Sequence, residues 1–394
     1  MSAVDTSDTL ANRSKPAIDC SVVSPFLSDE NGELGLIAKS HGNYLTYGDS
    51  AAPSTLWASY ARYLQKIIDR VNRNIENTTH TGKIETIRYI RHLVDIDLAV
   101  ESKLWKAHTD GCLAYIASIG GAQALIELSS TPDSSCSLFI RGVANQSLLI
   151  SPSHTMWHNM TTPALKHSLG YQSYTDDQFR LIIHEDYFYH EYPFPLELAI
   201  IQVHITRLRR RVATTTTITQ DELVPIILSL FERLTSVDLT KWMQDIAAFD
   251  AATNRPLAEM HRDAIWLYAI LALPRAAMLK WALAQPQAPH RETDGDPYDY
   301  FLQLYTSRIL EAMRALYPTI PYAPALSVAL TVVGVALAST GATEDREFVD
   351  RCLHDIWMMP VGSDSTYLRQ RKLREFWVSG KTGWEECFYE PTPG

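Results

Sequence analysis

The stretch Thr219-Gln-Asp-Glu-Leu-Val-Pro-Ile-Ile-Leu-Ser-Leu-Phe-Glu-Arg-Leu234 decides the fold class. Its apolar residues recur at steps of three and four positions, which places them on one face of an amphipathic α-helix. Thr219 stands at the N-cap position and Glu222 follows three residues later, which is the spacing of a capping box. The stretch therefore predicts a helix that begins after Thr219 and lays one face on a core.

The same period recurs outward from this stretch in both directions. It predicts a helix capped by Ser54, a pair of helices, a helix after Pro193 and Pro195, and two later helices. Strand-like alternation is nearly absent, and the threonine-rich run 213–218 favours a loop between helices. The ranges of the pair and of the two later helices are Ile84 to Ile126, Ile265 to Trp281 and Phe301 to Leu316.

These signals predict an all-α fold made of a single large multi-helix domain over residues 54–390. Residues 1–53 show no sustained period and are rich in Ser, Asp, Asn and Gly, so we expect a largely irregular N-terminal arm. Loops are expected at Ser129–Ser137, Pro286–Asp299 and Pro360–Thr366. The apolar run Leu326 to Ala338 is shorter than the roughly 20 residues that a membrane span needs, so it predicts a buried helix.

The charge balance excludes the usual nucleic-acid binder. The chain has 35 basic and 45 acidic residues in 394, a net charge of −10, which also disfavours an anionic membrane as partner. Its five cysteines are far apart, which excludes a clustered cysteine zinc site and fits a reducing compartment. The acidic first 30 residues lack an apolar signal segment, so we expect a cytoplasmic or nuclear protein.

Common catalytic motifs are absent from the sequence. We find no glycine-rich dinucleotide fingerprint, no phosphate loop, no His-Glu-x-x-His zinc helix and no Gly-x-Ser-x-Gly nucleophile elbow. We therefore expect neither a cofactor nor a metal.

The densest polar and aromatic stretch is His184-Glu-Asp-Tyr-Phe-Tyr-His-Glu-Tyr192. Imidazoles and carboxylates placed together can transfer protons near neutral pH. This composition makes His184, Asp186 and His190 the candidate catalytic residues, with Tyr187 and Tyr189 as candidate substrate contacts. The spacing is not specific for a metal. The alternative is a loop or helix end whose acids and tyrosines face water.

A second cluster is His154-Thr-Met-Trp-His158. Apolar walls with a few polar groups are typical of small-ligand sites, so Trp157 and His158 are candidate substrate-binding residues. The alternative is a capped helix start with Trp157 in the core.

Two further stretches favour structural roles. On the predicted helix around residue 265, His261, Ile265 and Tyr268 share one face. A lone histidine on a helix is more often structural than catalytic. The basic run Arg207–Arg211 is either a weak nuclear-import patch or a solvated helix end, and the helix end is favoured.

The stretch Leu104-Trp-Lys-Ala-His-Thr-Asp-Gly-Cys-Leu-Ala-Tyr-Ile-Ala-Ser-Ile-Gly-Gly-Ala-Gln-Ala-Leu125 resembles the regulatory domain of fungal zinc binuclear-cluster transcription factors. In that family a Trp and a His on one helix precede a Gly, an apolar stretch and a Gly-Gly pair. The matching residues here are Trp105, His108, Gly111, Gly120 and Gly121. Later positions also resemble the family: Leu93–Glu101, Pro324 to Ile356 with Gly334, Arg346 and Phe348, and the tryptophans Trp357 and Trp377. The resemblance implies an all-helical domain over roughly residues 57–385 and the capacity to form a homodimer.

The departure from the family pattern leads to two hypotheses. Residues 1–103 contain one cysteine, Cys20, and no basic cluster, whereas family members carry a six-cysteine zinc module that binds DNA. We expect no direct nucleic-acid binding and no membrane partner. One hypothesis is a repurposed domain that binds a small hydrophobic metabolite as a cofactor-independent cyclase, isomerase or pericyclase of fungal secondary metabolism. The other is a regulator or co-regulator of a fungal gene cluster without its own DNA-binding module.

Overall fold

A computed structural model of the chain describes residues 54–99, 104–130, 160–164, 174–182, 194–215, 218–245, 251–286, 295–317, 326–358 and 364–392. All regular elements within these ranges are helices, which confirms the predicted all-α class. The predicted arm 1–53 lies outside the described residues. In order, the helices are α2 (Ser54–Asn74), α3 (His80–Ala99), α4 (Trp105–Ser118), α5 (Gly121–Ser130), α7 (Asp176–Ile182), α9 (Leu196–Thr214), α10 (Gln220–Ser236), α11 (Leu239–Asp245), α12 (Ala251–Ala272), α13 (Arg275–Leu283), α14 (Pro297–Leu316), α15 (Ser327–Thr340), α16 (Thr343–Met358), α17 (Asp364–Ser379) and α18 (Trp384–Cys387).

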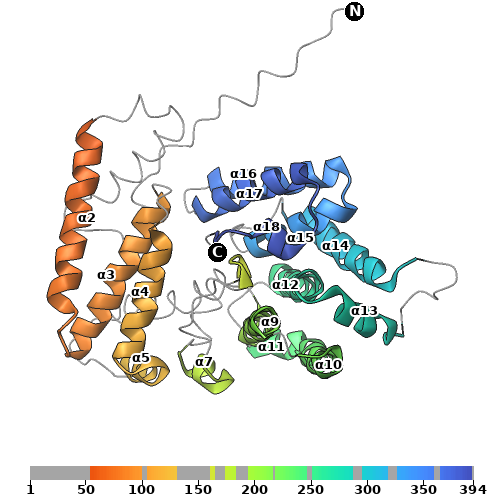
Figure 1. Cartoon of the computed structure of the whole chain (residues 1–394), viewed down its shortest axis with the longest axis horizontal. Helices are drawn as coiled ribbons and strands as arrows, with labels where there is room; N and C mark the ends of the chain where they lie inside the picture. The colour runs from red at the N-terminus through yellow and green to blue at the C-terminus, as the bar shows by residue number, and fades with distance from the viewer. Residues whose placement is uncertain are drawn as a thin grey trace, which may run out of the picture.

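Helix α12 is the central element of the larger part of the fold. It packs against α9, α11, α14 and α15, while α15 in turn packs against α16 and α17 (Figure 1). Helices α2, α3 and α4 stand side by side at the other end of the molecule (Figure 1). This layering surrounds α12 and α15 with other helices and buries most of the side chains of α15 and of residues 257–270 of α12.

Local sequence signals explain where two helices begin. The Thr219 hydroxyl accepts a hydrogen bond from the Glu222 backbone amide, and the Glu222 carboxylate accepts one from the Thr219 amide, so the predicted capping box of α10 is confirmed. Helix α14 begins at Pro297, four residues before the predicted start at Phe301. Asp296 accepts a hydrogen bond from the Tyr298 amide, and Pro297 fits the first helical position because it has no amide hydrogen to satisfy.

Two predicted helix boundaries were wrong. The stretch Ile84 to Ile126 forms parts of three helices rather than two, because α3 ends at Ala99 before α4 begins. Gly120 and Gly121 separate α4 from α5 with φ angles of 118° and 64°, as expected of a glycine helix stop. The stretch Ile265 to Trp281 is broken at Pro274, whose missing amide hydrogen and ring cannot continue α12.

The apolar run Leu326 to Ala338 forms the buried helix that its length predicted. Nearly all of α15 is buried, and Gly334 lets α17 approach closely. A Cβ on Gly334 would lie 2.5 Å from Cδ1 of Leu373, and the Trp377 indole donates a hydrogen bond to the Gly334 carbonyl at 2.7 Å. Glycine is therefore needed here for space, not for backbone conformation.

No single helix among the described residues has the length and apolar content to cross a membrane. Helices α4 and α5 meet that criterion only as a pair bent by 85°, by length and composition alone.

Candidate functional site

A small hollow lies between α9, α12 and α15. It measures about 230 Å³ with its open mouth included, and its enclosed part has room for about one water molecule. Its wall consists mainly of apolar and aromatic side chains. The lining residues are Met160, Phe194, Gln202, His261, Ala264, Ile265, Tyr268, Val328 and Val332.

One face of α12 contributes four of the nine lining residues. His261, Ile265 and Tyr268 all line the hollow, which confirms the prediction that they share a face of one helix. His261 is buried, and its ring lies 4.3 Å from the ring of Phe194, centroid to centroid. The two aromatic rings are therefore in contact within the wall of the hollow.

The hydroxyl of Tyr268 both accepts and donates hydrogen bonds within the protein, outside the hollow. The Arg209 guanidinium donates to it at 3.2 Å. Thr206 donates its own proton to the Gln202 carbonyl, so in the 3.1 Å contact between the two hydroxyls Tyr268 is the donor and Thr206 the acceptor. Tyr268 therefore presents its ring to the hollow and not a free hydroxyl.

Met160 has a fixed backbone and an adaptable side chain. Its carbonyl accepts hydrogen bonds from Arg209 and from the Trp384 indole, both at 2.8 Å. Its sulfur accepts a hydrogen bond from Nε2 of Gln202 at 3.2 Å. A thioether is a weak acceptor, so the buried amide of Gln202 has a poor partner for its proton.

Arg209 overturns the expectation for the basic run Arg207–Arg211. We expected a solvated helix end, but the Arg209 side chain is 1% exposed and pairs with Glu385. It also donates to the Thr162 carbonyl. A buried guanidinium needs such partners to offset its lost hydration. The run therefore includes a structural residue that ties α18 and residues 160–164 to α9.

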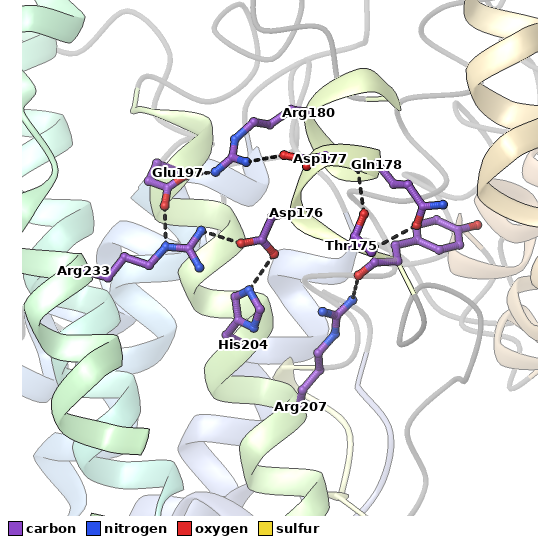
Figure 2. Close-up of polar contacts among 10 residues, drawn as sticks. Thr175, Asp176, Asp177, Gln178, Arg180, Glu197, His204, Arg207 and Arg233 are labelled. Atoms are coloured by element: carbon purple, nitrogen blue, oxygen red, sulfur yellow. Dashed lines mark hydrogen bonds and ion pairs between the residues drawn. The ribbon is translucent and has the colours of Figure 1, made fainter. Parts of the chain in front are cut away.

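The most connected charged cluster in the described part lies where α7 meets α9 and α10. Figure 2 shows Arg233 between Glu197 and Asp176, with its guanidinium 2.6 Å from one carboxylate and 2.7 Å from the other. His204 Nε2 lies 2.7 Å from the second oxygen of Asp176, and Arg180 extends the chain of contacts from Glu197 to Asp177 (Figure 2).

The electrostatics of this cluster keep its carboxylates ionised and its histidine neutral. Burial acts to raise the pKa values of Asp176 and Glu197, but hydrogen bonds outweigh it and lower both: Asp176 is bonded to His204 and Arg233, and Glu197 to Arg233 and Arg180, with the guanidinium charges acting in the same direction. Burial lowers the pKa of His204 and outweighs Asp176. Because these charges pair with one another, the cluster serves to attach α7 to α9 and α10.

Asp263 is a second perturbed group, on α12 and outside the hollow. Burial raises its pKa to about 6, although the Arg308 guanidinium at 3.0 Å acts to lower it. The half-exposed Arg308 also lies over the ring of Tyr305. A carboxyl group with this pKa changes its charge just below neutral pH.

The residues predicted from sequence as catalytic or substrate-binding all lie outside the described residues. These are His184, Asp186, Tyr187, Tyr189, His190, Trp157 and His158. Their neighbours along the chain are described, however: Met160 follows His158 by two residues, Phe194 follows His190 by four, and both line the hollow.

Gln202 and Met160 were not among the residues predicted from sequence. The signal for Gln202 was an amide inside the apolar run Leu198 to Ile205 of a predicted helix. Met160 had no comparable signal, because its contacts come from residues 202, 209 and 384.

Comparison with known proteins does not assign the chain to a family. Among the described residues no group of His, Cys, Asp and Glu side chains is placed to hold a metal ion. No protein-family model, no curated protein and no solved structure matches the chain.

Proposed function

We propose that this chain binds a small hydrophobic metabolite at the hollow between α9, α12 and α15 and acts on it as a cofactor-independent cyclase or isomerase. One observation carries the proposal. Both polar-aromatic clusters singled out in the sequence are tethered by two and four residues to lining residues of the same hollow, Met160 and Phe194. A tether of that length spans at most about 7 to 14 Å.

The composition of the hollow suits this chemistry. Ligand sites are mostly apolar with a few polar groups that fix orientation, and here the polar groups are Gln202 and His261. An apolar cage that holds a flexible substrate in a reactive conformer lowers the barrier without a cofactor. A hydrogen bond from His184, Asp186 or His190 would add electrostatic stabilisation of the transition state.

The family resemblance supplies the proposed history of the domain. A transcription-factor regulatory domain would supply the helical fold in which such a ligand site could develop. The small enclosed volume of the hollow favours a second candidate, a regulator or co-regulator that works through protein contacts and can dimerise. Fold alone does not separate the two.

The deciding experiment is conversion in vitro. The gene is deleted in its source organism, and extracts of the deletion and parent strains are compared by mass spectrometry. Purified full-length protein is then added to the deletion extract without any cofactor. We expect a compound that accumulates in the deletion strain to be converted to the parent product. Altered transcript levels with no accumulated compound and no conversion would support the regulator instead.

The site is tested in the same extract with two variants. Asp186→Asn and His190→Ala are expected to lower the conversion rate by about 100-fold or more if they act in proton transfer. Asp221→Asn and His354→Ala are the matched controls, since Asp221 is exposed at the start of α10 and His354 lies on α16. Wild-type rates in both test variants, with the fold intact by circular dichroism, would refute this choice of catalytic residues.

A further inference from the structure

Met160 and Gln202 are joined by a weak hydrogen bond, and the groups around them hold both residues in place. Gln202 is 2% exposed on α9, and its Nε2 donates to the Met160 sulfur at 3.2 Å. An oxygen atom would accept a stronger hydrogen bond from this N–H group than the thioether does. The weak bond to sulfur therefore offsets only part of the free energy lost when the amide is removed from water.

The rest of the neighbourhood holds both residues in place. Arg209 and Trp384 fix the Met160 carbonyl, so the backbone at residue 160 stays where it is. The Gln202 carbonyl accepts the Thr206 hydroxyl proton at 2.9 Å. The Met160 side chain is the adaptable element, because an unbranched thioether changes rotamer at little cost.

The lining of the hollow contains no carboxylate, amine or guanidinium, and His261 is its one side chain able to carry a positive charge. The guanidinium of Arg209 lies behind Tyr268 and the Met160 carbonyl, is hydrogen-bonded to both, and has its charge paired with Glu385. A carboxylate or phosphate would enter this space without a permanent counter-charge, which is costly in a buried site.

We infer that Met160 is a side-chain plug, and that the ligand is an uncharged hydrophobic molecule whose carbonyl oxygen displaces the Met160 sulfur and accepts the proton of Gln202. This inference rests on the proposed function and adds to it the class of ligand and the group that recognises it. Movement of the plug also enlarges a hollow that otherwise holds about one water molecule.

The test uses three small probes on the full-length protein. Acetophenone carries the carbonyl, α-methylstyrene replaces that oxygen with a methylene group, and benzoate carries a charge. Binding is followed by the methyl resonance of Met160 in protein labelled with ¹³C-methyl methionine, assigned through Met160→Leu. We expect acetophenone to shift this resonance, to bind about fivefold more tightly than α-methylstyrene, and benzoate not to bind.

Two variants identify the recognising group. Gln202→Leu is expected to abolish the preference for acetophenone over α-methylstyrene, while Gln123→Leu, an exposed matched control, keeps it. Met160→Leu conserves volume and removes the sulfur acceptor, so the preference is expected to increase, and this variant serves if Gln202→Leu does not fold. An unchanged Met160 resonance, benzoate binding as tight as acetophenone, or a preference that survives Gln202→Leu would overturn the inference.

Failure of this inference is distinguishable from failure of the proposed function. Conversion of the accumulated compound in the deletion extract, with no probe response at Met160, would overturn the inference alone. A probe response of the expected pattern without any conversion would overturn the proposed activity and support the binding site.

Discussion

Arg209 shows how much of the fold depends on one buried cation. Its guanidinium donates to carbonyls at residues 160 and 162 and pairs with Glu385. We expect Arg209→Ala to lower the free energy of unfolding by about 3–5 kcal/mol, because two buried carbonyls lose a charged donor and Glu385 loses its partner. Arg211→Ala, two positions further along α9 and exposed, should change it by less than about 0.5 kcal/mol. Urea unfolding of the two variants measures the difference, and equal stabilities would contradict it.

Asp263 makes the stability of the protein depend on pH. Its folded pKa of about 6 exceeds that of an unfolded aspartate, so between pH 4 and 6 the folded state keeps a proton that the unfolded chain has lost. The contribution of this group is present below about pH 4 and is lost as the pH rises through 6. Asp263→Asn stays neutral, so its stability relative to wild type should increase by about 1–3 kcal/mol between pH 4.5 and 7.5.

Urea unfolding at four pH values across this range tests Asp263. A difference between variant and wild type that does not change with pH would contradict the expectation. Arg308 is half exposed, so its charge stays hydrated in the variant and adds little to the difference.

At the scale of the helix, two glycines differ in whether a larger side chain would fit at their position. Gly334 in α15 faces Leu373 of α17, and an added Cβ would lie 2.5 Å from it, whereas Gly111 in α4 has open space around its Cβ position. Gly334→Ala should destabilise the protein by about 1–3 kcal/mol through overpacking. Gly111→Ala should stabilise it by about 0.5–1 kcal/mol, because alanine favours the helix.

Thermal and urea unfolding of the two glycine variants give the signs directly. The double variant Gly334→Ala with Leu373→Ala should lose the clash while keeping the cavity cost of the smaller side chain. If Gly334→Ala is as stable as Gly111→Ala, the close approach of α15 and α17 does not exist.

The attachment of α7 should weaken in acid. Asp176 and Glu197 have lowered pKa values, so their contribution is present above the pKa of an unfolded carboxyl group and is lost as the pH falls through the folded value. The lowered pKa of His204 acts in the same direction. As the pH falls below about 6.5, this histidine is protonated in the unfolded chain before it is protonated in the folded protein, which favours unfolding. Hydrogen exchange, corrected for intrinsic rate, should therefore become faster in α7 than in α9 as the pH falls from 7 to 3, with His204 responsible for the change above about pH 5 and the two carboxylates for the change below it.

Arg233→Gln tests the same attachment at constant pH. This residue joins Asp176 to Glu197, so its loss should raise exchange in α7 at pH 7 by about two- to fivefold, the effect of about 0.5–1 kcal/mol. Arg255→Gln is the control, because the Arg255–Glu259 pair lies within α12. Equal exchange in both variants would show that apolar packing of α7 is sufficient.

Helix positions were predictable where the signal is local. The capping box at Thr219, the glycine stop at Gly120 and the shared face of His261 and Tyr268 all depend on residues within one or two turns. The break at Pro274 was also visible in the sequence, but the apolar period on both sides outweighed it in our prediction. The hollow itself was not predictable, because its wall comes from α9, α12, α15 and the residues around 160 and 194.

At the scale of the whole molecule, the C-terminal residues close the chain back onto residues 160–164. The Trp384 ring packs on Tyr268 at 4.8 Å between centroids, and its indole donates to the Met160 carbonyl. Thr161 and Thr392 exchange a pair of hydrogen bonds across 231 positions of sequence. The sequence around Thr161 gives no signal for a contact with Thr392, and the sequence around Thr392 gives none for Thr161, so this closure could not be predicted.

The closure makes the hollow depend on the last part of the chain. Removal of residues 381–394 should lower the free energy of unfolding by at least the ~3–5 kcal/mol expected of Trp384→Ala, because a fully buried indole is lost. Trp384→Phe keeps an aromatic ring but has no indole N–H to donate to Met160. We therefore expect the conversion rate per folded molecule to fall even under conditions in which the variant is fully folded. Urea unfolding and extract conversion, measured on the same preparations, test this: a loss of conversion that only parallels the loss of stability would show that Trp384 supports the fold without positioning Met160.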